Sequence, residues 1–204
     1  MTTSPRTVVL ASRNAKKLAE LRRILVPQVP DIEVLGLDDV EEFDEPAETE
    51  PTFEGNALIK ARACLQVTGL PSLADDSGLC VDALNGMPGV LSARWSGEGD
   101  RANNALLLRQ IGDVPDWRRT AQFRCAVALC LPGGTEIIEH GEMAGRILRI
   151  ERGDGGFGYD PLFAADRYDV STAELDPEDK DLISHRGKAL RAIAPHLVNA
   201  LSPS

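Results

Sequence analysis

The sequence predicts a mixed α/β fold, in which helices flank one extended, twisted sheet. Short apolar runs typical of strands alternate with amphipathic helical segments, and two of the strands are joined by a tight turn. The chain has 204 residues, of which 43% are hydrophobic and 26% charged, so a substantial core is expected. We expect a single domain over residues 1–204.

The opening residues predict a strand followed by a helix. Residues 7–12, "TVVLAS", form a short apolar run typical of buried strands. Residues 15–25, "AKKLAELRRIL", carry leucines at helical spacing, and Pro27 ends the pattern. The leucines expected on the inward face are Leu18, Leu21 and Leu25.

A second helix and a short strand are expected next. The helix is predicted over residues 52–69, and Gly69 ends it. The residues expected to face the core are Phe53, Ala57, Cys64 and Val67. Residues 72–75, "SLAD", predict a short strand that places Asp75 and Asp76 at its C-terminal end.

The second half predicts a helix, a β-hairpin and two further helices. The helix covers residues 100–112, with Asp100 as N-cap. Residues 119–131 alternate in apolar character, and a "PGG" turn leads to a second strand from about Thr135. An Asp-Pro pair starts a short helix, and Ser184 caps the last one. Its inward residues are Leu190, Ile193, Leu197 and Leu201.

Charge and cysteine content exclude several classes of protein. The net charge of -10 argues against a sequence-independent nucleic-acid binder. Nine acids and no base lie between Asp38 and Glu54, a pattern expected of a solvated loop. No signal peptide or membrane span is evident, and the cysteines form no CxxC pair. Of the four cysteines, Cys64, Cys80 and Cys125 fall among apolar neighbours, whereas Cys130 is not assigned. We therefore expect a soluble, cytoplasmic protein in which those three are reduced core residues.

The adjacent carboxylates of Asp75 and Asp76 raise a physical problem. They repel each other, and neither is stable in a dry site without a positive partner. A compensating cation or cationic side chain would make the pair a functional site. The alternative is that Asp76 and Ser77 only form a turn, as "DDSG" often does.

Residues 12–17, "SRNAKK", join the first strand to the first helix. Their backbone N–H groups and two lysines could hold a phosphate at the helix N-terminus. A capped turn with solvated lysines is the alternative. The segment is not a Walker A loop, because the GxxxxGK[ST] spacing is absent.

Two segments near the C-terminus could contact a ligand. Gly153, Gly155 and Gly158 match GxGxxG, but Tyr159-Asp160-Pro161 stands where a dinucleotide-binding helix would begin. The glycines instead suit a loop that presents Phe157 to a flat ligand; a plain turn with Phe157 in the core is the alternative.

The second of these segments, residues 180–189, places positive side chains at a helix start. His185 and Arg186 oppose the helix dipole there, and Lys180 lies one segment before, as expected where a ligand compensates. His140 and His196 are interpreted as structural.

Together these segments resemble the inosine triphosphate pyrophosphatase family, which comprises non-canonical purine nucleoside triphosphate pyrophosphatases such as dITP/XTP pyrophosphatases. The motifs are "SRNAKK", "ETEPTFEGNALIKA", "ADDSGL", "GMPGVLSARWSG", "GGFGYDPLF" and "SHRGKAL", in the order and spacing of that family from about Val8 to Leu201. The chain departs from the pattern twice. Gly55 stands where an acid usually precedes Asn56, and Glu50 replaces a usual glycine.

The resemblance implies two lobes around a central active-site cleft and a house-cleaning hydrolase. Such an enzyme cleaves ITP, dITP or XTP between the α- and β-phosphates, giving the monophosphate and pyrophosphate. It implies Mg²⁺ as cofactor and a homodimer as the assembly. Two alternatives stay open: a phosphatase acting on another phosphorylated small molecule, and a non-catalytic nucleotide sensor.

The resemblance also implies residue roles. Asp76 is the catalytic proton acceptor and a metal ligand with Glu48, and Asp75 orients or supports it. Phe157 stacks on the purine, and Arg186, which has only donors, suits the 6-oxo group of hypoxanthine rather than the 6-amino group of adenine. The expected substrate-binding residues are Ser12, Arg13, Asn14, Ala15, Lys16, Lys17, Lys60, Asp75, Ser77, Phe157, Gly158, Tyr159, Asp160, Lys180, His185 and Arg186.

Overall fold

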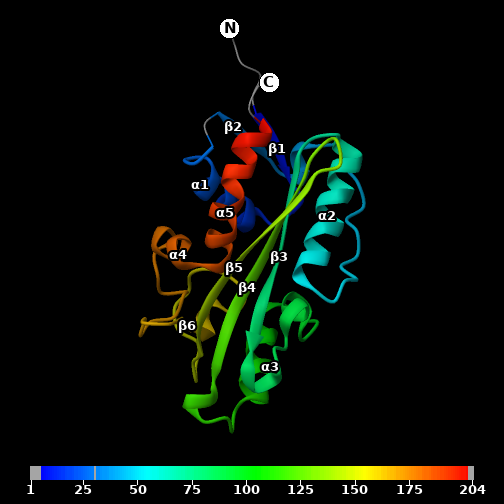
Figure 1. The fold of residues 1–204 in the computed structure, drawn as a ribbon. Coiled ribbons are helices and arrows are strands. Elements are labelled where there is room, and N and C mark those ends of the chain that lie inside the picture. Colours follow the sequence, from blue (N-terminus) through cyan, green and yellow to red (C-terminus); the bar gives the residue numbers. More distant parts are fainter. Residues whose placement is uncertain (1–5, 30, 202–204) are drawn as a thin grey trace. The chain divides into compact units, whose positions relative to one another are not determined.

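A six-stranded mixed sheet runs through the protein. The computed structural model describes residues 6–29 and 31–201. The strand order is β2-β1-β3-β4-β5-β6 (Figure 1). β1 runs parallel to both β2 and β3, whereas β5 and β6 are antiparallel, so the predicted mixed sheet is confirmed. The strands are β1 (Arg6–Leu10), β2 (Ile32–Leu35), β3 (Ser72–Val81), β4 (Thr120–Cys130), β5 (Glu136–Ile147) and β6 (Phe163–Ala165).

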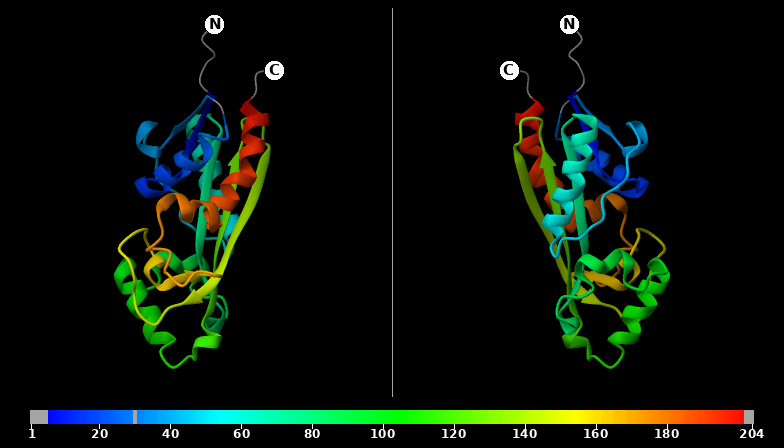
Figure 2. Two further views of the ribbon diagram at one scale, coloured as in Figure 1. Left: turned by 90° about the vertical axis from the view of Figure 1, so that its left-hand side faces the viewer. Right: turned by 90° about the vertical axis from the view of Figure 1, so that its right-hand side faces the viewer.

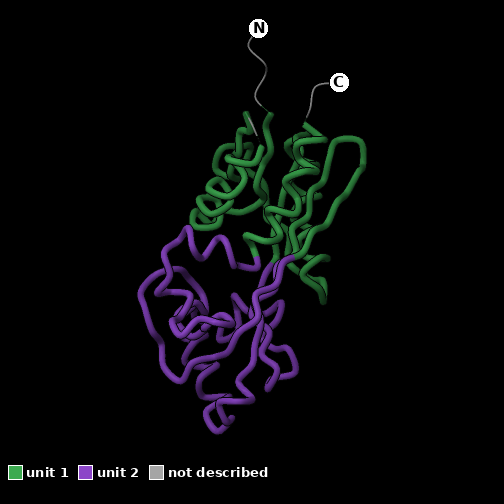
Figure 3. The backbone as a smooth tube through the Cα atoms, turned by 60° about the vertical axis from the view of Figure 1, so that its left-hand side comes forward, with its two compact units in different colours: residues 1–76, 126–140, 186–204 green, residues 77–125, 141–185 purple. Residues whose placement is uncertain are grey.

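Five α-helices accompany these strands in the described part of the chain. They are α1 (Ala15–Leu25), α2 (Phe53–Thr68), α3 (Asp100–Gln110), α4 (Pro177–Ile183) and α5 (His185–Leu201). None of them is long and apolar enough to cross a membrane. The chain divides into two compact units (Figure 3), and the expected central cleft stays a prediction.

The first unit contains residues 1–76, 126–140 and 186–204. Strands β1, β3 and β4 contribute small and branched side chains to its core, including Val9, Ala74 and Ala128. The two opposite views of Figure 2 show α2 in front of the sheet in one, and α1 and α5 in the other. In α2 the buried positions Ala57, Ala61 and Cys64 follow the helical period.

The second unit contains residues 77–125 and 141–185. Its core joins α3 to the sheet through Leu107 of the helix and Ile111 just after it, in one cluster with Leu79, Phe123 and Phe163. The glycine-rich loop around Phe157 belongs to this unit and is followed by a single 3-10 turn, Asp160–Leu162. The exclusion of a dinucleotide-binding helix there is therefore confirmed.

The strand predicted over residues 72–75 is longer than expected. β3 continues to Val81, so Asp75 and Asp76 lie in the middle of a strand rather than at its end. β3 lies between β1 and β4 in the sheet, but β1 pairs with it only at Ser72 and Leu73. Past the carboxylates, the N–H groups of Leu79 and Val81 donate to Ser92 Oγ and to the Met87 carbonyl. The prediction that the strand ends at the two aspartates is therefore wrong, and β2 and β6 were not predicted.

Two details of the helices also differ from expectation. Val67 is 40% exposed, because the inward row of α2 continues from Cys64 to position 68 rather than 67. Gly99 precedes α3 as the N-cap with φ at 87°, and Asp100 is the first helical residue. Gly69 ends α2 in the left-handed conformation, as predicted. Leu201 is only partly buried.

Candidate active site

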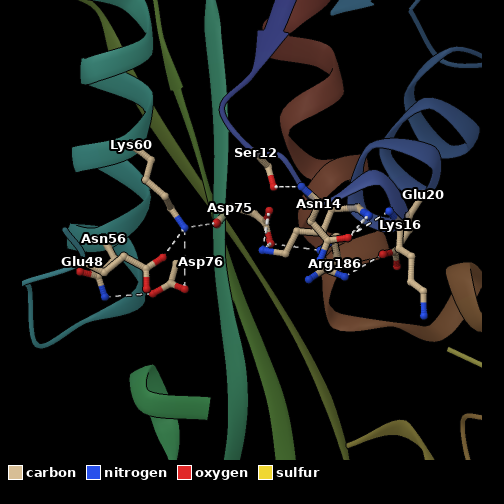
Figure 4. A network of polar contacts seen from close by, with 11 residues as sticks. Ser12, Asn14, Lys16, Glu20, Glu48, Asn56, Lys60, Asp75, Asp76 and Arg186 are labelled. Carbon is tan, nitrogen blue, oxygen red and sulfur yellow. Dashed lines mark hydrogen bonds and ion pairs between the residues drawn. The ribbon is translucent and has the colours of Figure 1, made fainter. Parts of the chain in front are cut away.

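The strand β3 keeps its two adjacent carboxylates apart. Successive side chains of a strand point to opposite faces of the sheet. Asp75 therefore points to the side of α1 and α5, and Asp76 to the side of α2 (Figure 4). Each carboxylate meets its own set of partners, which removes the problem that the sequence posed.

Asp75 is held by two cations. Lys17 Nζ lies 3.1 and 3.0 Å from its two carboxylate oxygens, and Arg186 Nε donates to Oδ2 at 3.1 Å. Arg186 Nη1 also donates to Glu20 at 2.7 Å. Burial alone would raise the pKa of Asp75, but Lys17, Arg186 and Lys60 outweigh it and hold the pKa well below its ordinary value. Asp75 is therefore a permanent anion that fixes both cations.

The start of α1 places Lys17. Asn14 caps the helix, accepting hydrogen bonds from the N–H groups of Lys16 and Lys17 at 3.0 and 3.2 Å. Ser12 Oγ in turn accepts from the Asn14 N–H at 3.2 Å (Figure 4). The "SRNAKK" turn is thus a capped helix start, and its cap brings Lys17 to the buried side.

Asp76 has a different environment on the other face of β3. Asn56 Nδ2 donates to Asp76 Oδ2 at 3.0 Å. Lys60 Nζ lies 4.0 Å from Asp76 Oδ1 and donates to Glu48 at 2.7 Å and to the Asp75 carbonyl at 2.8 Å. Burial and the charge of Glu48 raise the pKa of Asp76, although Lys60 and Asn56 act in the opposite direction. A carboxylate with a raised pKa is suited to accept a proton.

The neighbouring aspartates are thus tuned in opposite directions, which is typical of paired carboxylates with separate roles. In the metal-free protein we expect Asp76 to take up a proton at a higher pH than an ordinary aspartate, while Asp75 stays ionised. Because the charge of Glu48 raises the pKa of Asp76, Glu48→Gln should lower it. Carboxyl ¹³C chemical shifts recorded over a pH series would measure both residues. Similar titration of Asp75 and Asp76 would contradict this assignment.

Glu48 and Asp76 form a donor set that suits a small divalent cation. Both carboxylates converge on Lys60, and their mutual repulsion contributes to the raised pKa of Asp76. Mg²⁺ in proteins is bound by one or two carboxylates, with waters and phosphate oxygens completing the shell. No cluster of three or more His, Cys, Asp or Glu side chains that could hold a metal occurs in the part of the chain that the structure describes. The two carboxylates fit Mg²⁺ if substrate and water supply the rest.

The two departures from the family pattern lie in contact with each other. A Cβ atom added to Gly55 would lie 2.5 Å from Glu50 Cβ and 2.7 Å from Glu50 Cγ. The side chain of Glu50 thus occupies the space that a side chain at position 55 would need. The Glu50 N–H donates to Asn56 Oδ1 at 2.9 Å, which orients the amide that binds Asp76.

This contact predicts that Gly55→Ala destabilises the protein when Glu50 is present and stabilises it when Glu50 is replaced by glycine. Gly55→Ala should lower the free energy of unfolding by about 1–3 kcal/mol, because the new methyl group meets the stem of Glu50 rather than a flexible end. In a Glu50→Gly background the same change should stabilise by up to about 1 kcal/mol, as alanine replaces glycine in a helix. Urea unfolding of the four proteins would measure it, and additive effects would contradict the contact.

In the second unit, the expected base-binding residues form their own cluster. Lys180 Nζ donates to Asp160 Oδ2 at 2.6 Å and lies 5.3 Å from the centre of the Phe157 ring. Asp160 Oδ2 also accepts from the Phe157 N–H at 2.8 Å, and Thr172 donates to its other oxygen at 2.9 Å. Asp160 therefore links the aromatic residue to Lys180.

The remaining predicted residues are placed as follows. Arg13 turns to the acidic stretch and pairs with Glu45 at 2.8 Å. Tyr159 is buried and its hydroxyl donates to the Ser92 carbonyl at 3.0 Å. His185 stacks on Phe123 with ring centres 4.8 Å apart. Ala15 and Lys16 are exposed at the start of α1, and Ser77 is the half-buried residue after Asp76 in β3.

Sequence reasoning missed two residues of the first unit. Glu20 is 5% exposed and binds Arg186, and Asn56 is fully buried and binds Asp76. A signal for each was present. Glu20 lies three residues after Lys17 beside the inward Leu21, and Asn56 precedes the inward Ala57.

The chain is similar to known proteins over most of its length. The Ham1 family model matches residues 8–196. A dITP/XTP pyrophosphatase of Nocardia farcinica is 62% identical over 193 residues, covering 93% of this chain and 94% of the relative. A crystal structure of a nucleoside-triphosphatase / dITP/XTP pyrophosphatase from Mycobacterium abscessus matches with a TM-score of 0.76 at 54% identity, covering 93% of this chain and 99% of that chain. The Staphylococcus aureus Ham1 protein matches with a TM-score of 0.83 at 37% identity, covering 95% and 98%.

Proposed function

The chain belongs to the Ham1 family, and from that premise we propose that it hydrolyses non-canonical purine nucleoside triphosphates. The substrates are ITP, dITP and XTP, and the products are the monophosphate and pyrophosphate. The observation that carries this proposal is the placement of the adjacent aspartates: Asp75 binds Lys17 and Arg186 on one face of β3, and Asp76 lies with Asn56, Lys60 and Glu48 on the other. Relatives at 62% and 56% identity that are named dITP/XTP pyrophosphatases support it.

Side chains of the first unit are proposed to have separate roles in the reaction. Asp76 is proposed to accept the proton of the attacking water as a general base. Asn56 and Lys60 hold that carboxylate in place. Burial alone would lower the pKa of Lys60, but Asp75, Asp76 and Glu48 raise it, so the side chain stays cationic. Lys60 and Lys17 thus supply positive charge for the triphosphate.

Mg²⁺ is part of this proposal, held by Glu48 and Asp76. When bound, such a cation polarises phosphate oxygens and lowers the pKa of bound water. The purine is proposed to stack on Phe157, with Asp160, Lys180 and His185 at its edge. We also propose a cytoplasmic homodimer; the four cysteines are buried and free, as expected of a reducing compartment.

The identity of the product tests the proposal. We expect ITP, dITP and XTP to yield pyrophosphate with much larger kcat/KM than ATP, because a buried site matched to a 6-oxo group can reject a 6-amino group by up to about 10⁴-fold. Coupled assays for pyrophosphate and for inorganic phosphate, run on the same reactions, would measure this. A chelator should abolish turnover and Mg²⁺ should restore it, while Ca²⁺ with its longer bonds restores less.

The same assays separate the alternatives. Free phosphate as the first product would identify a phosphatase, and binding of ITP without turnover in Mg²⁺ would identify a nucleotide sensor. Full activity in excess chelator would contradict the proposed Mg²⁺ dependence but not the proposed substrate class.

A further inference from the structure

Helix α3 holds the loop that carries Phe157. Asp100 Oδ2 accepts a hydrogen bond from the Gly158 N–H at 2.8 Å. Asn104 Nδ2 donates to the Gly158 carbonyl at 3.2 Å. Both polar backbone groups of one loop residue are therefore bound by side chains of one helix. All three residues belong to the second unit.

The geometry of this contact follows from the helix and the glycine. Asp100 and Asn104 are four residues apart, so they lie on the same face of α3. Gly158 has φ at 61°, in the left-handed region that glycine adopts without strain. The acceptor and the donor on α3 then meet the N–H and the carbonyl of the same residue.

The buried side-chain amide of Asn104 is a second observation that points to a specific role for this residue. Its side chain is 3% exposed, and its Oδ1 has no hydrogen-bond partner among the described residues. Burying a polar oxygen without a partner is unfavourable, and an apolar residue of similar size would avoid that penalty. An asparagine at this position is explained by its donor, which reaches the Gly158 carbonyl.

We propose that Asp100 and Asn104 are positioning residues that orient the ring of Phe157 for the purine. This inference rests on the proposed function, in which the base stacks on Phe157. Phe157 directly precedes Gly158 in the chain, and the backbone N–H of Phe157 donates to Asp160. With Gly158 fixed on one side and Asp160 on the other, the backbone of Phe157 is held before a ligand arrives, which lowers the entropic cost of binding.

A purely structural role for Asp100 makes a different prediction. An acid in the first turn of a helix also stabilises it through the helix dipole. Asp100→Asn removes the charge but keeps an oxygen that accepts from Gly158, whereas Asp100→Ala removes both. The positioning role predicts that Asn preserves function and Ala does not.

The test compares substrates with and without a base. In Asp100→Ala we expect KM for ITP to rise by up to about tenfold, as for the loss of one hydrogen bond, with kcat little changed. Asp100→Asn should stay close to wild type. The inhibition constant of inorganic tripolyphosphate, which has no base, should not change in either variant. In a Phe157→Ala background, Asp100→Ala should add no further loss.

Several results would overturn the proposal. One is a rise in the inhibition constant of tripolyphosphate equal to the rise in KM for ITP. The others are a further rise in KM when Asp100→Ala is added to Phe157→Ala, and an Asp100→Asn variant as impaired as Asp100→Ala. Asn104→Leu gives a second check: it should raise KM for ITP without lowering the urea midpoint, and a lowered midpoint with unchanged KM would contradict the role. Hydrogen exchange of the Gly158 amide tests its hydrogen bond to Asp100 without an activity assay. It should be faster in Asp100→Ala, and unchanged exchange rejects the inference even if no purine triphosphate proves to be a substrate.

Discussion

Asp76→Asn is expected to abolish most turnover of ITP while leaving its binding largely intact. Asparagine keeps the shape of the side chain but cannot accept a proton at neutral pH, and it is a poorer ligand for Mg²⁺. Loss of a positioned base typically lowers the rate by about 10²–10⁴-fold. The proposed metal contact would add to that loss.

The stability of this variant distinguishes a catalytic defect from a folding defect. Burial and Glu48 disfavour the charged form of Asp76, as its raised pKa indicates. The neutral isostere should therefore be at least as stable as the wild type, and Asn56 can still donate to its oxygen. Steady-state kcat, ITP binding and urea unfolding would be measured together. A near-wild-type rate would remove Asp76 from its assigned role, and a marked loss of stability would assign the lost rate to a folding defect.

The sequence indicated which residues gather at the site but not how they are separated. Asp75 and Asp76 were recognisable as a pair that needs positive partners. Their assignment to opposite faces depended on β3 continuing past them, and that depends on the pairing of β3 with β4 in the sheet. Strand pairing between distant segments is a tertiary property, which local residue patterns do not specify.

The partners of the two aspartates were foreseen to different extents. Lys17 and Lys60 lie in motifs that point to phosphate chemistry, so they could be predicted. Glu20 looked like one more exposed acid of an amphipathic helix until Arg186, 166 positions away in the sequence, was placed beside it. The contact between Glu50 and Gly55 was equally hidden, because each residue by itself reads as an isolated departure.

Arg186→Met is expected to be the most destabilising change in the first unit. Arg186 bridges Asp75 and Glu20, and the side chains of Arg186 and Glu20 are 4% and 7% exposed. Removing the cation leaves buried carboxylates short of a partner, which typically costs about 3–5 kcal/mol. Arg62→Ala is the matched control. Arg62 also makes two bonds to one carboxylate, Glu136, but it is 55% exposed, so its loss should cost less than about 1 kcal/mol.

Arg186→Lys separates charge from geometry in the same experiment. Lysine keeps the charge but lacks the planar fork that reaches Asp75 with Nε and Glu20 with Nη1, so it should recover only part of the lost stability. Urea unfolding at neutral pH measures all three variants, and equal costs for Arg186→Met and Arg62→Ala would refute the bridging role. The interpretation of Arg186 as the reader of the 6-oxo group is tested on the Lys variant, by its kcat/KM for ITP and for ATP. A loss of the preference for ITP supports that interpretation, whereas an equal fall in both assigns Arg186 to holding the two carboxylates.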